Sequence, residues 1–229
     1  SAIGGGDQNV ASNDFTTVGG GQFNVALANY STIAGGYDNS AIGVRSTIGG
    51  GDRNVTSNSY ATVGGGTQNN ASGLQATVSG GTQNQALGAS STVGGGANNS
   101  AQVLYATVGG GYQNKAAETY STVSGGLQNM ATGQYSTVSG GRANQALATN
   151  STVAGGFVNR AAGAYSAVGG GSGNWATGSY ATVSGGQNGS AYGEYSTVGG
   201  GSENWSVATN STVAGGFSNR ASGAYSAVG

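Results

Sequence analysis

The stretch Tyr195–Gly201, which reads Tyr-Ser-Thr-Val-Gly-Gly-Gly, decides the fold, because its wording returns every 15 residues without an insertion or deletion. We count each repeat from its Val, here called the anchor. The anchor is Val or Ile in all sixteen copies, from Ile3 to Val228. The second and third residues after it are Gly in all fifteen complete copies. Self-similarity at a short fixed period predicts a repeat architecture in which each copy is one structural unit.

The composition agrees with a repeat protein and excludes several other classes. Among 229 residues there are 49 Gly, 6% charged residues and no Pro, Cys or His, which is not a globular composition. Collagen is excluded because Gly does not recur at every third residue. A net charge of -1 offers no electrostatic footprint for nucleic acid, and no apolar run is long enough for direct membrane insertion. The chain begins and ends within a repeat, so we expect it to be a segment of a longer protein.

The repeat reads as two short strands and two turns. The residues before the anchor alternate and favour strand, and the Gly pair marks a tight corner or a close approach of two backbones. A second strand is expected over the Asn-x-Ala-x segment that follows. Fifteen residues per coil then give a narrow, all-β solenoid, which we treat as a single repeat domain over 1–229 of about fifteen coils.

Alternation along these strands predicts which columns face inward. The anchor, the Ser or Ala two residues before it and the Ala eight residues after it are expected inside. Thr before the anchor and the aromatic residue three before it are expected outside. None of the thirteen charged side chains, six basic and seven acidic, falls at an inward position. Asn recurs six residues after the anchor in fourteen of fifteen copies, with Gly189 as the exception, and we expect a structural amide ladder there.

An aromatic stripe suggests that one chain is not sufficient. The inward columns supply a meagre core, whereas an aromatic residue stands three before the anchor in ten of fifteen copies. Such a stripe either binds a ligand or packs against sister chains, and we favour packing between identical solenoids. Its tyrosines are Tyr30, Tyr60, Tyr105, Tyr120, Tyr135, Tyr165, Tyr180, Tyr195 and Tyr225.

The repeat resembles the head repeats of YadA-like trimeric autotransporter adhesins. Ser196-Thr197-Val198-Gly199 and Asn174-Trp175-Ala176-Thr177-Gly178 match that family's two segments in type, and the Gly-Gly-Gly wording is most similar to the heads of ubiquitous surface proteins. The resemblance implies a left-handed parallel β-roll in which two further copies of the chain complete a homotrimer. It also implies display on the bacterial cell surface and attachment to host extracellular-matrix proteins, surface receptors or other bacteria. No stalk, neck or membrane anchor is visible in this segment.

No enzyme, cofactor or metal site is predicted. Without His or Cys there is no ordinary nucleophile–base pair or zinc site, and the carboxylates lie on distant coils. The Gly runs lack the Lys-Ser/Thr of a phosphate loop, and the period differs from that of a calcium-binding β-roll. Candidate ligand contacts are Trp175 and Trp205, with Arg160 and Arg220 in the same column, because exposed Trp and Arg are enriched at binding hot spots. The alternative is that they fill a seam between chains or are ordinary surface residues.

Three functions remain open from the sequence. The preferred one is a rigid adhesin rod that attaches through many weak, repeated contacts. The competing one is a structural rod of an extracellular filament, phage tail fibre or surface layer. A remote third is ice binding by the Thr column, although Thr is also simply a good strand residue.

Overall fold

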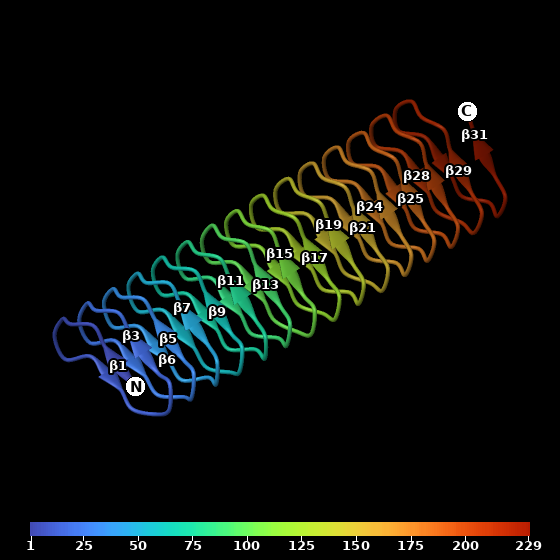
Figure 1. Cartoon of the computed structure of the whole chain (residues 1–229). Coiled ribbons are helices and arrows are strands. Elements are labelled where there is room, and N and C mark those ends of the chain that lie inside the picture. Colours follow the sequence, from blue (N-terminus) through green and yellow to red (C-terminus); the bar gives the residue numbers. More distant parts are fainter. The chain divides into compact units, whose positions relative to one another are not determined.

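The computed structural model describes residues 1–229, which form two compact units, 1–113 and 114–229. Both units are wholly β and repeat the same coil. Figure 1 shows the coils of each unit following one another along the chain, with corresponding strands side by side. The prediction of a parallel β-solenoid with 15 residues per coil is confirmed. Left-handedness, the homotrimer and a single domain stay predictions.

Each coil contains two strands of two residues. In unit 1 the first strand ends on the anchor, in β1 (Ala2–Ile3), β3 (Thr17–Val18), β5 (Thr32–Ile33), β7 (Thr47–Ile48), β9 (Thr62–Val63), β11 (Thr77–Val78), β13 (Thr92–Val93) and β15 (Thr107–Val108). The second strand ends eight residues after the anchor, in β2 (Val10–Ala11), β4 (Val25–Ala26), β6 (Ser40–Ala41), β8 (Val55–Thr56), β10 (Asn70–Ala71), β12 (Gln85–Ala86) and β14 (Ser100–Ala101).

Unit 2 follows the same scheme. Its first strands are β17 (Thr122–Val123), β19 (Thr137–Val138), β21 (Thr152–Val153), β23 (Ala167–Val168), β25 (Thr182–Val183), β27 (Thr197–Val198), β29 (Thr212–Val213) and β31 (Ala227–Val228). Its second strands are β16 (Lys115–Ala116), β18 (Met130–Ala131), β20 (Gln145–Ala146), β22 (Arg160–Ala161), β24 (Trp175–Ala176), β26 (Ser190–Ala191), β28 (Trp205–Ser206) and β30 (Arg220–Ala221).

Pairing is parallel and in register, so each residue lies beside its equivalent one coil later. Thr17 pairs with Thr32, and Thr17 N donates to Ser31 O at 3.0 Å. The strands are shorter than the sequence predicted, and a third contact column was missed. Four residues after the anchor, single residues form parallel bridges between coils, for example Gln22 with Tyr37. Each coil therefore has three extended segments rather than two, because the Gly corner leaves one residue free to pair before the chain turns again.

The core consists of the predicted inward columns together with the Asn column. The anchors Val18 to Val213 are at most 1% exposed, and most Ala residues eight positions after an anchor are 0–1% exposed. The Ser or Ala two before the anchor is also buried in most coils. Thr before the anchor lies outside or half-buried. The predicted inward columns are confirmed, and they hold only small side chains because two strands this close leave little space between them.

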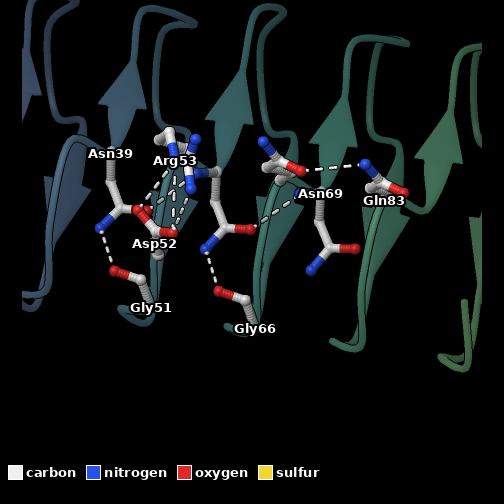
Figure 2. A network of polar contacts seen from close by, with 9 residues as sticks. Asn39, Gly51, Asp52, Arg53, Gly66, Asn69 and Gln83 are labelled. Carbon is white, nitrogen blue, oxygen red and sulfur yellow. Dashed lines mark hydrogen bonds and ion pairs between the residues drawn. The ribbon is translucent and has the colours of Figure 1, made fainter.

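The Asn column forms a buried ladder in which the side-chain amides within each unit are paired several times. Asn39 Nδ2 donates to Gly51 O at 2.9 Å (Figure 2). It also donates to Gly35 O at 3.2 Å, and Asn39 Oδ1 accepts from Asn54 N at 2.9 Å. Each Asn therefore ties its own Gly corner to the corner of the next coil. A buried polar group is tolerated when its bonds are satisfied, so this column is structural, as predicted.

The Gly three residues after the anchor, which is the second of the recurring Gly pair, is required by two independent constraints. Gly51 has φ of 95°, and a Cβ built on it would lie 2.1 Å from Gly66 O of the next coil. Gly50, one residue earlier, would place its Cβ no closer than 3.7 Å to another atom. The predicted close approach of two backbones is thus located at the second Gly of each recurring pair.

The aromatic stripe does not continue the strand, which corrects its assignment by alternation. Tyr195 has φ of 56° and lies in a turn that Ser196 closes, since Ser196 N and Ser196 Oγ donate to Gly193 O at 3.1 and 2.6 Å. Every residue of this column has a positive φ near 55°. The rings are exposed because they stand on a turn, not because they alternate with the anchor. A bulky residue rarely adopts this conformation, so contacts of the ring must offset the energetic cost of the positive φ.

Candidate binding face

The four candidate contact residues lie in one outward column of unit 2. They occupy the first residue of successive second strands, whose following residue points into the core. In-register pairing aligns Arg160 with Trp175, Trp175 with Ser190, Ser190 with Trp205 and Trp205 with Arg220. We call these five residues the Arg–Trp column. The two indoles are separated by one rung that bears Ser, and an arginine lies on the next rung beyond each indole.

The indoles of the Arg–Trp column line an open groove. Trp175 and Trp205 are 42% and 37% exposed, whereas Ser190 between them is 6% exposed and forms the floor. The groove has a volume of about 510 Å³, and its lining residues are Val158, Gly173, Trp175, Asn188, Ser190, Tyr192, Glu203 and Trp205. A second groove, of about 280 Å³, shares Trp205 and Tyr192 with the first and is also lined by Val207 and Arg220.

Sequence reasoning missed three polar members of this face, Tyr192, Asn188 and Glu203. Tyr192 is nine residues after its anchor, where no other copy has an aromatic residue. That departure from the Tyr column was the available signal. Asn188 and Glu203 stand five after their anchors, in a column whose backbone has positive φ. Their place beside the indoles follows only from the fold of the coil.

The rung beneath the groove departs from the rest of the chain. Gly189 interrupts the Asn ladder, although its N–H still donates to Asn174 Oδ1 at 2.8 Å. Gly173, one coil earlier, has φ of 66°, and a Cβ there would lie 2.6 Å from Asn188 Oδ1. Asn188 therefore leans over Gly173 and forms part of the groove wall. Gly173 thus leaves room for the Asn188 side chain in the groove, whereas Gly189 faces the interior, where a Cβ would meet Val183 and Val198.

The aromatic stripe forms stacks within the chain. In unit 2 the rings of Tyr165 and Tyr180 are 4.9 Å apart at 2°, and those of Tyr180 and Tyr195 are 4.8 Å apart at 9°. In unit 1 the guanidinium of Arg45 lies over the rings of Tyr30 and Tyr60, at 5.3 and 5.5 Å. The tyrosines of the stripe remain about half exposed, apart from Tyr225 in the last coil, which is 80% exposed. Stacking offsets the cost of the positive φ and leaves one aromatic edge open to solvent.

A polar face of unit 1 provides a contrast. A groove of about 520 Å³ is lined by Arg53, Gln68, Gln83, Gln85 and Asn98 and contains no aromatic residue. Figure 2 shows its amide and ion-pair contacts, including the 2.9 Å bond from Arg53 Nη2 to Asp52 Oδ2. These hydrogen bonds lower the pKa of Asp52 and raise that of Arg53. Both groups face water, so the pair adds little to stability.

Two further structural findings bear on the site. No three His, Cys, Asp or Glu side chains come together in a way that could hold a metal ion. None of the chain's elements is a helix long and apolar enough to cross a bilayer.

Comparison with known proteins identifies the repeat. A family model described as the ubiquitous surface protein adhesin repeat matches residues 31–43, 151–163 and 211–223. Each match runs from the buried Ser before the first strand to the second residue after the second strand, and two of the three contain an arginine of the Arg–Trp column. No curated protein sequence matches the chain significantly. The predicted resemblance to ubiquitous surface protein heads is confirmed, since three segments of this parallel β-solenoid are similar to the ubiquitous surface protein adhesin repeat.

Proposed function

We propose that this chain is the attachment segment of a bacterial surface adhesin and that it binds through side chains presented on the outside of its coils. The observation that carries the proposal is the adhesin repeat in three coils together with an exposed Trp pair. The two Trp lie in the same outward column as an arginine from each of two matched coils. Exposed Trp and Arg at the centre of a polar surface are typical of binding hot spots. The targets we propose are host matrix proteins, host cells or other bacteria.

The mechanism is attachment by several weak contacts at once. The backbone ladders hold the outward columns at fixed spacing, so side chains on neighbouring coils meet a surface without rearrangement. We further propose that two other copies of the chain pack alongside it to form a trimer, with the aromatic stripe at or near the contact. A trimer would present each column three times, and linked sites gain avidity without any new contact.

A bead assay tests attachment directly. Beads coated with the full chain should be retained under flow on epithelial cells, on matrix-coated glass or on a bacterial lawn, beyond uncoated beads. The double variant Trp175→Gln and Trp205→Gln should lower retention, because it removes both exposed indoles. Gln is chosen because it already occupies the same position of the coil at Gln85 and Gln145, so the fold accepts it. The control is the double variant Gln85→Ala and Gln145→Ala, which should be retained like the native chain.

Retention equal to that of uncoated beads on every surface would contradict the proposal and favour the structural rod of a filament, fibre or surface layer. Sedimentation tests the trimer separately. Three chain masses in solution support it, and a stable monomer contradicts it while leaving attachment to be decided by the beads.

A further inference from the structure

The spacing of the two indoles in the Arg–Trp column restricts what the groove can hold. Tyr180 and Tyr195, which are one coil apart, have ring centroids 4.8 Å apart. Trp175 and Trp205 are two coils apart through Ser190, so their positions repeat after about 9.6 Å. A ligand that contacts both indoles must therefore present two similar flat faces at that interval along the stacking direction.

An extended chain of pyranose rings has this property. In a glycan whose linkages are all equatorial, each ring advances by about the spacing of one strand, and every second ring presents the same face. One disaccharide then spans the distance from one indole to the other. The C–H bonds on the face of a pyranose carry partial positive charge and pack against the negative face of an aromatic ring. The ring between the two stacked sugars would lie over the short Ser190 rung.

Polar groups around the indoles match the hydroxyl groups of such a chain. Asn188 and Tyr192 each provide a donor and an acceptor, and Glu203 provides acceptors, on the walls of the groove. Arg160 and Arg220 lie at the two ends of the column, four rungs apart, which is the length of about four sugar rings. A small number of polar groups that converge on an apolar surface is typical of small-ligand sites.

A peptide strand fits this face less well. The backbone groups of the strands beneath are already bonded to neighbouring coils, as Trp175 N is to Gly189 O and Trp205 N is to Asn219 O at 2.8 Å. An added strand gains affinity from main-chain hydrogen bonds at an exposed sheet edge, and this face offers none. The ligand must instead bind through ring faces and side-chain polar groups.

From this geometry we propose that the Arg–Trp column binds an extended, equatorially linked pyranose glycan that runs along the column, with alternate rings stacked on Trp175 and Trp205. The proposal deepens the attachment function proposed above and rests on it. It assigns the surface partner to the carbohydrate class and places the contact in unit 2.

Tryptophan fluorescence gives a clean test, because the chain contains two Trp and both lie in this column. The full chain is titrated with glucose, cellobiose, cellotetraose and N-acetylchitotetraose. Maltotetraose, whose axial linkages curve the chain, is the shape control. We expect a saturable change with at least one β-linked tetrasaccharide, at about tenfold lower concentration than with its disaccharide or monosaccharide, and none with maltotetraose.

Single variants assign the contact to the column. Trp175→Gln and Trp205→Gln should each weaken tetrasaccharide binding about tenfold, with the remaining Trp as reporter, and Trp175→Tyr should restore most of it by keeping an aromatic face. Gln85→Ala, at the same position of the coil in unit 1, should leave binding unchanged. Circular dichroism checks that all variants keep the fold, as expected for exposed positions.

Three results would overturn the inference: no fluorescence change with either β-linked tetrasaccharide up to tens of millimolar, equal binding of maltotetraose, or tetrasaccharide binding that is insensitive to both Gln variants. Bead retention distinguishes this failure from failure of the proposed function. Native beads that attach while the sugars do not bind leave adhesion intact and refute the glycan. Sugars that bind while beads attach nowhere leave the site intact and refute adhesion.

Discussion

Filling the gap in the Asn ladder should stabilise the solenoid. Gly189 is the one copy without the amide, so the N–H of Asn204 lacks the acceptor that Oδ1 of the preceding Asn provides elsewhere, as Asn144 Oδ1 does for Asn159 N at 2.9 Å. The backbone of Gly189 does not have a positive φ, so an L-residue is tolerated there. In the variant Gly189→Asn we expect three recovered hydrogen bonds: two from Nδ2 to the Gly corners and one accepted by Oδ1.

The magnitude follows from these terms. Three buried hydrogen bonds contribute about 0.5–1.5 kcal/mol each, and replacing Gly removes about 0.5–1 kcal/mol of backbone entropy cost. Ordering the side chain costs about 1 kcal/mol. A Cβ at Gly189 would lie 3.1 Å from Asn174 Oδ1 and 3.3 Å from the Cγ1 atoms of Val183 and Val198, so a small adjustment is required. The net gain is about 2 kcal/mol.

Native-state hydrogen exchange is the right assay, because a repeat protein opens locally and its global transition need not be two-state. The Asn204 amide should exchange about thirtyfold more slowly in Gly189→Asn than in the native chain. The matched control Asn144→Gly creates a second gap and should speed exchange of the Asn159 amide. Unchanged or faster exchange at Asn204 in a folded Gly189→Asn variant would refute the account of the ladder as a source of stability.

Three other substitutions test the coil. Gly156→Ala places a Cβ 2.2 Å from a carbonyl oxygen of the next coil at φ of 89°, so it should lower the free energy of unfolding by about 3 kcal/mol or more. In the control Gly155→Ala the Cβ meets nothing within 4 Å, so the stability should hardly change. Equal urea midpoints for the two variants would contradict the corner geometry. Tyr180→Ala removes two ring stacks and should lower the free energy of unfolding by about 1–3 kcal/mol. Tyr180→Asn should lower it less, because Asn tolerates a positive φ. A melting temperature of the Asn variant at or below that of the Ala variant would contradict this account. The hydrogen bond from Arg53 lowers the pKa of Asp52, so the carboxylate and the ion pair persist above that pKa and are lost as the pH falls through it. An NMR titration of Asp52 should show a higher midpoint in Arg53→Gln than in the native chain. An unchanged midpoint would contradict the pairing of the two side chains.

Much of the fold is predictable from the sequence because one period governs every level of it. A repeat of 15 without insertions requires in-register stacking, and the strict anchor and Ala columns then have to face the narrow interior. The Asn ladder follows from the same reasoning, since a polar residue recurring beside Gly corners has their carbonyls within reach. No homologous sequence or partner is needed for these steps.

Other features could not be read from residue types. Alternation assumes a continuous strand, and nothing in Tyr-Ser-Thr-Val shows that the strand begins only at Thr. Tyr in a left-handed conformation contradicts its local preference, and only stacking between coils makes it acceptable. The bridge column after the Gly corner was missed because its residues vary from Asp7 to Phe217 and carry no pattern. The groove beside Trp175 depends on Asn188 leaning over Gly173, which is a contact between coils.

The in-register ladder also has a consequence for heredity. Because each coil starts and ends at the same place in the stacking pattern, a gene that gains or loses 15 codons by unequal recombination still encodes matched ladders. The insertion or deletion of a single codon instead leaves one coil with a residue too many or too few and disturbs its stacking on the two neighbouring coils. Blocks of several coils are copied as readily as one, and Ser151–Gly169 nearly recurs as Ser211–Gly229. Recombination can therefore change the number of coils in one step and leave their fold intact, while substitutions at outward positions alter the surface one residue at a time.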